Sequence, residues 1–274
     1  MPRSLVVLLF VSFLAFNLYG LNAEIGTLHA LVLVDEYSEI STACIADKFK
    51  IEEEVQIIAQ KTRMQLNLQQ IDYSKDGLER SIEALEVGEN DVIFFYFTGH
   101  GYRYENQITC GDLPYLYLTK AQEHLYEAGI CLDAITEQLK AKAPRLLVSL
   151  ADCCNNILPY EEPVAMNTAL VGEVYKKLFL QTEGHIIATS SLPGQFSFAT
   201  NNGGYFTNGF LATIRDLASL ESDLNQITWE KVLKRTTALT IINSESKQKP
   251  QYQMEVNAIE EKAIPGMVIL PGNN

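Results

Sequence analysis

The segment that most constrains the fold is an unbroken apolar run from Val92 to Phe97. A strand with one face in water alternates polar and apolar residues, so an uninterrupted run of strand length indicates a strand buried on both faces. Strands of this kind belong to parallel sheets that helices cover on both sides. The run ends abruptly at Thr98-Gly99-His100-Gly101. The chain is therefore expected to fold as an α/β protein with polar groups at the carboxyl end of a central strand.

The rest of the chain alternates β-rich apolar runs with amphipathic segments, which is typical of a mostly parallel sheet. The predicted strands are Leu28–Val34, Gln65–Ile71, Val92–Phe97, Leu146–Leu150 and Ile186–Ser190. The predicted helices are Ile45–Gln60, Lys75–Leu85, Ile130–Lys140, Val171–Leu180, Phe206–Ala218 and Trp229–Ile241. With 47% hydrophobic and 20% charged residues, and no internal repeat or flexible linker, residues 24–274 are expected to form one domain.

The first 23 residues have the pattern of a signal peptide. A short start with Arg3 precedes an apolar stretch from Leu5 to Leu18, and small residues follow up to Ala23. The stretch is shorter than the roughly 20 residues that span a bilayer, although an uncleaved membrane anchor is the alternative. We expect the folded domain to begin near Glu24 and the protein to be secreted or located in the cell envelope, such as the periplasm.

The net charge argues against two classes of partner. The chain has 21 Lys and Arg against 34 Asp and Glu, which gives a net charge of −13. Proteins that bind nucleic acid or anionic lipid carry the opposite sign. We therefore expect no nucleic-acid partner, no membrane partner after signal removal, and a cationic partner or substrate.

A histidine and a cysteine follow two predicted strands at equivalent places. His100 comes just after Val92–Phe97, and Cys154 comes just after Leu146–Leu150. The intervening chain is long enough for a crossover helix, so the strands can be parallel neighbours whose ends share one edge of the sheet. A thiol is mostly protonated at neutral pH, and an adjacent imidazole can take its proton and later deliver it to a leaving amine. The pair indicates nucleophilic catalysis.

The two-residue period of an extended chain separates the adjacent cysteines. Thr98 and His100 share one side, as do Asp152 and Cys154, whereas Cys153 points to the opposite, packed side. A buried structural cysteine is the alternative for Cys154. A redox or metal site built on the adjacent pair is a weaker interpretation, because neighbouring cysteines form only a strained ring and lack further ligands.

At this point the sequence resembles a known family. The segment from Phe94 to Gly101 is similar to the histidine motif of the caspase and metacaspase cysteine proteases, and Asp152-Cys153-Cys154 resembles the Asp-x-Cys motif of metacaspases. Ala43–Asp47 resembles the segment after the first metacaspase strand. Three later segments resemble prokaryotic members in the right order, and the similarity spans residues 28 to 256: Ile187–Ser191, Gly203–Thr207 and Gln248–Tyr252. The resemblance implies a caspase-like three-layer sandwich, with a mostly parallel six-stranded sheet and helices on both faces.

The resemblance also implies roles for individual residues. His100 is the expected general base and acid, Cys154 the nucleophile, and the N–H groups of Gly101 and Cys154 the oxyanion donors. The expected substrate pocket is formed by Cys44, Asp47, Thr98 and Asp152. Two carboxylates in a narrow recess should accept a guanidinium or ammonium group, so cleavage is expected after Arg or Lys of a peptide or protein.

Two departures from the family pattern affect activity and specificity. Metacaspases usually continue Cys-His-Ser-Gly, whereas Asn155 and Asn156 follow Cys154 here. A catalytically inactive caspase-fold module that binds peptides or a protein is therefore the alternative function. The Gln-Ala-Cys signature of true caspases is absent, which argues against cleavage after aspartate.

The remaining candidates carry weaker signals. No cofactor and no metal is required for the chemistry, although the resemblance makes calcium a candidate activator. The acidic residues near the motifs do not form a calcium-binding loop and are expected to be surface charges: Glu105, Asp112, Glu161 and Glu162. The other histidines have no ligand spacing and are expected to be structural or solvated: His29, His124 and His185. Cys110 and Cys131 can pair or remain free, and Lys176-Lys177 is either a self-processing site or a solvated helix face.

Overall fold

A six-stranded sheet forms the centre of the molecule, in the strand order β11-β8-β7-β3-β1-β2. The computed structural model describes residues 26–103, 110–120, 129–155, 172–220 and 224–259. The strands are β1 (Thr27–Val34), β2 (Gln65–Gln70), β3 (Val92–Thr98), β7 (Leu146–Asp152), β8 (Thr182–Thr189) and β11 (Gln251–Ala258). Neighbouring strands run parallel except β11, which pairs antiparallel with β8 at the edge. The expected mostly parallel six-stranded sheet is confirmed.

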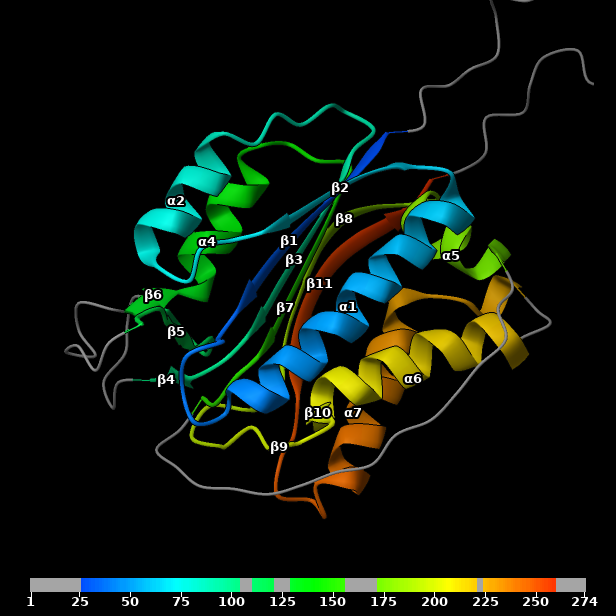
Figure 1. The fold of residues 1–274 in the computed structure, drawn as a ribbon. Helices are drawn as coiled ribbons and strands as arrows, with labels where there is room; N and C mark the ends of the chain where they lie inside the picture. The colour runs from blue at the N-terminus through cyan, green and yellow to red at the C-terminus, as the bar shows by residue number, and fades with distance from the viewer. Residues whose placement is uncertain (1–25, 104–109, 121–128, 156–171, 221–223, 260–274) are drawn as a thin grey trace, which may run out of the picture.

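Helices cover both faces of the sheet, so the molecule has three layers (Figure 1). One face carries α1 (Ser41–Thr62), α5 (Gly172–Phe179), α6 (Tyr205–Leu220) and α7 (Trp229–Asn243). The other face carries α2 (Lys75–Glu83) and α4 (Leu132–Lys140). A short 3-10 helix, Leu224–Gln226, precedes α7.

The apolar run that defines β3 supplies both layers of the core. Phe94 and Tyr96 pack into the layer under α1 and α6, while Phe95 and Phe97 pack into the layer under α2 and α4. All four side chains are fully buried. The alternation of side chains across a strand explains why no polar residue is tolerated in this segment.

Each of the five predicted strands and six predicted helices is present, with shifted ends. At Ile130–Lys140 the element type was partly wrong, because Gly129–Cys131 forms a short strand, β6, and the helix begins only at Leu132. The individual strand β11 was not among the predicted strands. Its residues alternate between partly buried and exposed, as expected of an edge strand with one covered face.

Two small sheets extend from the carboxyl edge of the main sheet. The first consists of β4 (Gly101–Tyr102), β5 (Tyr115–Tyr117) and β6, and the second of β9 (Ala199–Thr200) and β10 (Gly203–Gly204). A disulfide joins Cys110 to Cys131, which resolves the state of these two cysteines as paired. The bond links the segment before β5 to β6, within the part of the chain that forms the three-stranded sheet.

Two further predictions concern described residues away from that edge. His29 is structural, because its imidazole lies 3.0 Å from the Asp91 carboxylate at the amino end of β1. Lys176 pairs on the helix surface with Glu173. His124, Glu105, Glu161, Glu162 and the predicted signal segment lie outside the described residues. None of the described helices is both long and apolar enough to cross a membrane.

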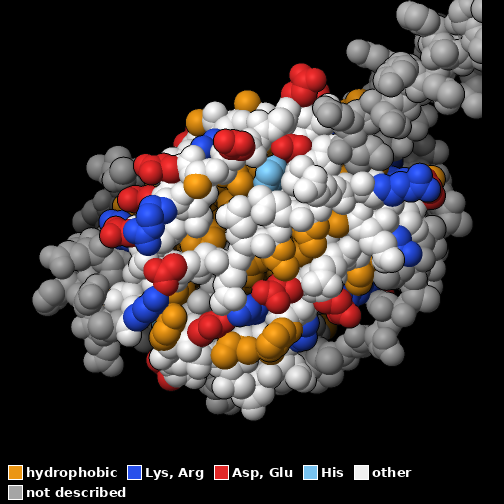
Figure 2. All heavy atoms as spheres, turned by 45° about the horizontal axis from the view of Figure 1, so that its top comes forward, with side chains coloured by type: hydrophobic (Ala, Val, Ile, Leu, Met, Phe, Trp, Pro, Cys, Tyr) orange, Lys and Arg blue, Asp and Glu red, His pale blue; other side chains and the backbone are white. Residues whose placement is uncertain are grey.

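Acidic and basic side chains are interspersed with hydrophobic ones on the face shown in Figure 2. On this face the Asp and Glu side chains stand apart from one another rather than in one cluster.

Candidate active site

The sheet register brings the two predicted catalytic segments together. Thr98, the last residue of β3, is directly paired with Asp152, the last residue of β7. The backbone N–H of Gly99 donates to the Asp152 carbonyl at 3.3 Å, so the chains are still adjacent where the strands end. His100 and Cys154 each follow two residues later. Both line one pocket of about 460 Å³ at the carboxyl edge.

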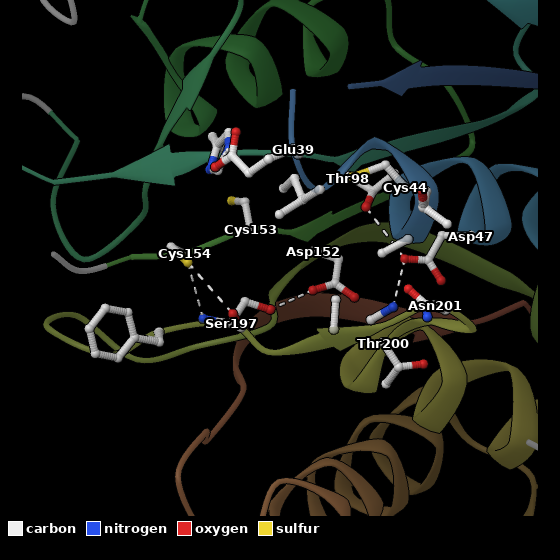
Figure 3. Close-up of a pocket in the computed structure, with 18 residues that line it drawn as sticks. Glu39, Cys44, Asp47, Thr98, Asp152, Cys153, Cys154, Ser197, Thr200 and Asn201 are labelled. Carbon is white, nitrogen blue, oxygen red and sulfur yellow. Dashed lines mark hydrogen bonds and ion pairs between the residues drawn. The ribbon is translucent and has the colours of Figure 1, made fainter. Parts of the chain in front are cut away.

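The pocket also draws residues from the segments that follow β1 and β8. Its other lining residues are Glu39, Ile40, Thr42, Ala43, Cys44, Asp47, Thr98, Gly99, Asp152, Cys153, Phe196, Ser197, Ala199, Thr200, Asn201 and Gly204. Cys154 and Glu39 lie toward one end of it, and Asp47, Thr200 and Asn201 toward the other (Figure 3). This arrangement places the Cys154 thiol at one end and the Asp47 carboxylate at the other.

The thiol and the imidazole each have a described partner of their own. The Sγ of Cys154 accepts from the Ser197 N–H at 3.4 Å and donates to the Ser197 carbonyl at 3.6 Å. The Nε2 of His100 lies 3.1 Å from Oε1 of Glu39. The two groups therefore share the pocket while each contacts a residue that the sequence did not single out.

Burial sets the protonation of the adjacent cysteines. It raises the pKa of the Cys154 thiol, and the Ser197 N–H partly offsets this increase. Burial also raises the pKa of Cys153 well above its usual value, and this side chain is only 1% exposed. A Cβ at Gly101 would lie 2.7 Å from the Cys153 sulfur and 2.4 Å from the Cys154 carbonyl oxygen. Only glycine permits this close approach of β4 to the thiol segment.

Two carboxylates of the pocket are buried, and Asp152 lies between Cys154 and Asp47 (Figure 3). The oxygens of Asp152 accept from the Ser197 hydroxyl at 2.6 Å, and from the N–H and hydroxyl of Thr207 at 3.1 and 2.7 Å. Oδ2 of Asp47 accepts from the Gly204 N–H at 2.8 Å, whereas its Oδ1 has no hydrogen-bond partner within the described ranges. Both carboxylate oxygens of Asp152 thus accept hydrogen bonds within the protein, whereas Oδ1 of Asp47 accepts none from the described residues.

Burial raises the pKa of both carboxyl groups, and Asp152 raises that of Asp47 further. Burial, and then repulsion from Asp152, raise the pKa of Asp47 well above its usual range, against the Gly204 N–H and the nearby Lys50 charge. Burial raises the pKa of Asp152 as well, and its hydrogen bonds from Ser197 and Thr207 offset part of this rise. A cation in the pocket would favour the charged form of both groups.

A pair of glycines forms the wall over these carboxylates. A Cβ on Gly203 would lie 1.8 Å from Oδ1 of Asp47, and a Cβ on Gly204 would lie 1.9 Å from Oδ2 of Asp152. Gly203 also has a φ of +97°, a region that residues with side chains rarely adopt. Any larger residue here would cover the carboxylates.

The remaining predicted pocket residues lie beside Asp47. Cys44 and Asp47 are both buried near the start of α1, and both line the pocket. The Thr98 hydroxyl donates to Oδ2 of Asp47 at 3.4 Å. Burial raises the pKa of the Cys44 thiol well above its usual value. Cys44 therefore contributes an uncharged wall beside the carboxylates.

The structure thus gathers the predicted residues in one place, with Gly101 directly behind the thiol segment. Sequence reasoning missed Glu39, Ser197 and Thr207. Ser197 and Thr207 reach the site from segments about fifty residues after Cys154. Thr207 ends the family-like segment Gly203–Thr207, but nothing in the sequence assigns either hydroxyl to a buried carboxylate. Glu39 precedes the helix that carries Asp47 and had no distinguishing pattern.

The three-layer fold, with an imidazole and a thiol in one pocket at the carboxyl edge of its sheet, defines a class of α/β cysteine peptidases. A family model of the caspase domain (Peptidase C14) matches residues 29–258, and the chain belongs to this family. The chain is similar to the crystal structure of caspase-1 from Spodoptera frugiperda, with a TM-score of 0.50 and 13% identity. That alignment covers 84% of this chain and 88% of the caspase-1 chain, and at this identity it shows the fold alone. A search of the curated proteins found no match.

Proposed function

We propose that this protein is a metacaspase-type cysteine endopeptidase that cleaves peptide bonds after Arg or Lys. The observation that carries the proposal is the buried Oδ1 of Asp47, which has no partner in the described part of the chain and faces a second buried carboxylate. A buried acceptor without a donor costs about 1–3 kcal/mol. A cationic side chain that enters the pocket from the Cys154 end would supply the missing donor.

The proposed chemistry uses the thiol end of the pocket. His100 takes the proton of Cys154, and the sulfur attacks the carbonyl carbon of the scissile bond to form a tetrahedral oxyanion. The N–H groups of Gly101 and Cys154 would hold that oxyanion, at about 3 kcal/mol each. The amine leaves with the proton from His100, and water then hydrolyses the thioester with His100 again as the base.

The proposed specificity follows from the negative charge of the two pocket carboxylates, Asp47 and Asp152. An arginine or lysine side chain on the acyl side of the bond would extend from Cys154 toward Asp47 and Asp152, where its charge offsets the repulsion between them. An aspartate would add a third negative charge in a poorly hydrated site. We expect peptides with Arg or Lys to exceed matched Asp peptides at least ~100-fold in kcat/KM, or about 2.7 kcal/mol.

A fluorogenic peptide panel that varies only this residue tests the proposal directly. Hydrolysis after Arg or Lys by the wild type, and its loss in Cys154→Ala, is the expected result. Preferential cleavage after Asp would refute the pocket assignment. Turnover by Cys154→Ala would refute the nucleophile.

The second candidate function is a catalytically inactive module that binds basic peptides. It is favoured by one observation, the contact of the Cys154 thiol with both backbone groups of Ser197. A peptidyl chloromethylketone ending in Arg separates the two functions. Rapid labelling of Cys154, with Cys153 unlabelled, supports the peptidase, whereas a Cys154 no more reactive than free cysteine supports the binding module.

The proposed location and regulation rest on the sequence. Residues 1–23 are proposed to direct the chain to secretion or to the cell envelope, where the disulfide would be maintained. Within the described ranges no three carboxylate, imidazole or thiol groups converge as metal ligands would. Activation by calcium stays a prediction, which the peptide panel tests with and without the ion.

A further inference from the structure

We propose that Glu39 is the positioning residue of His100, a role that rests on the proposed peptidase function. The carboxylate of Glu39 lies 3.1 Å from Nε2 of the imidazole, and both residues line the pocket that holds the Cys154 thiol. Glu39 lies in the segment between β1 and α1, whereas His100 follows β3. The contact therefore joins two separate segments at the sheet edge, and it involves His100, the general base of the proposed dyad.

The backbone that carries Glu39 is held by a local turn. Oδ1 of the buried Asp35 accepts from the N–H groups of Tyr37 and Ser38, each at 3.0 Å. The N–H of Ser41 then donates to the Ser38 carbonyl at 3.1 Å, which leads directly into α1. The N–H of Asp35 is itself bonded to the carbonyl of Thr98, at 3.0 Å. The turn is thus tied to Thr98, the last residue of β3 and two residues before His100, so the carboxylate and the imidazole are positioned by one framework.

The contact determines which nitrogen of the imidazole can act as the base. The two atoms lie within ion-pair distance, and a carboxylate oxygen can only accept a hydrogen bond, so the contact favours a proton on Nε2. The other nitrogen, Nδ1, then has the free lone pair that can receive the thiol proton. An orienting acceptor on the far nitrogen is the general arrangement for a catalytic histidine. Glu39 supplies that acceptor from a side chain.

The exposure of the two side chains indicates that Glu39 orients the imidazole rather than stabilises the fold. The Glu39 side chain is 79% exposed, whereas the His100 side chain is 23% exposed. An exposed ion pair adds little to stability, so removal of the carboxylate should leave the fold intact. What it should change is the tautomer and orientation of the imidazole.

The kinetic test compares Glu39→Ala with Glu39→Gln on one arginine peptide. We expect Glu39→Ala to lower kcat at least ~5-fold with KM within about twofold of wild type, because an interaction that orients the base affects the chemical step. Glu39→Gln keeps a carbonyl acceptor for Nε2–H and should recover part of kcat. Glu36→Gln is the matched control in the same segment, since Glu36 bonds Lys48 and Gln70 and does not line the pocket. A rise in KM alone would mean that Glu39 binds substrate and would overturn the inference.

A second measurement does not depend on activity. The full chain has 4 histidines, so ¹⁵N-histidine NMR can follow His100, assigned by the signal lost in His100→Gln. The wild type and Glu39→Gln should show a single Nε2–H tautomer, and Glu39→Ala a mixture of both. An unchanged tautomer in Glu39→Ala overturns the inference, whatever kcat does. A wild type that cleaves no peptide would instead overturn the proposed function, and the tautomer would still decide whether Glu39 positions His100.

Discussion

Replacing Asp47 with Asn should weaken the activity and strengthen the fold at the same time. The carboxylate is buried, faces the carboxylate of Asp152, and leaves Oδ1 without a partner among the described residues. The folded protein therefore holds a proton on Asp47 more tightly than the unfolded chain does. Stability from this group is present below the unfolded pKa of ~3.9 and is lost as pH rises through the higher folded pKa.

The structure allows both effects to be estimated. Removing the charge removes a desolvation cost and a repulsion, which for a buried group without a partner amounts to at least about 1 kcal/mol. In a domain of this size that is a rise in Tm of about 2–4 °C. Loss of one of two buried carboxylates should lower kcat/KM for arginine peptides by ~100-fold, or about 2.7 kcal/mol.

Differential scanning calorimetry at pH 8 and pH 4, together with the peptide assay, measures both quantities. We expect the gain in Tm at pH 8 and a smaller gain at pH 4, where the wild-type carboxyl is more protonated. Asp152→Asn is the matched comparison, because hydrogen bonds from Ser197 and Thr207 already satisfy Asp152 and the substitution should give little or no gain. A lower Tm for Asp47→Asn at pH 8, or an unchanged kcat/KM for arginine, would refute the reasoning.

Three further predictions follow from other parts of the chain. Gly204→Ala places a methyl group 1.9 Å from Oδ2 of Asp152, so hydrolysis of arginine peptides should fall at least ~10-fold, as the same panel would show. Replacing Cys110 and Cys131 together with Ser opens a loop with a sequence separation of 21 and should cost about 3 kcal/mol in urea unfolding; an unchanged midpoint would contradict this. Intact mass of protein from the native host should place the mature N-terminus near Glu24, whereas a form retaining Met1 would support the membrane anchor.

Local patterns in the sequence are enough to predict most of the fold. A segment such as Val92–Phe97 has only one low-energy environment, a strand covered on both faces, because each of its side chains must leave water. The helices with apolar residues at a period of 3.6 follow for the same reason. The edge strand β11 was not predicted, because its mixed polar and apolar residues have no strong periodicity. The strand β6 was not predicted because it contains only the residues Gly129–Cys131.

Local sequence patterns identified some residues of the candidate site as well. His100 and Cys154 were predictable because each follows an apolar strand, and the alternation of side chains identified Asp152 as the companion of Cys154 and placed Cys153 on the opposite side. The motif resemblance added Asp47.

Only the tertiary structure decided what these groups contact. The partners of the thiol, the imidazole and the buried carboxylates are Ser197, Glu39, Thr207 and Gly204, which lie far along the chain from the side chains they contact. Whether Asp47 keeps a free oxygen depends on how β10 and α1 meet, and whether His100 has an acceptor depends on the turn after β1. Distances of this kind arise from the packing of the whole chain, because a hydrogen bond requires two groups within about 3 Å and local periodicity leaves that separation undetermined.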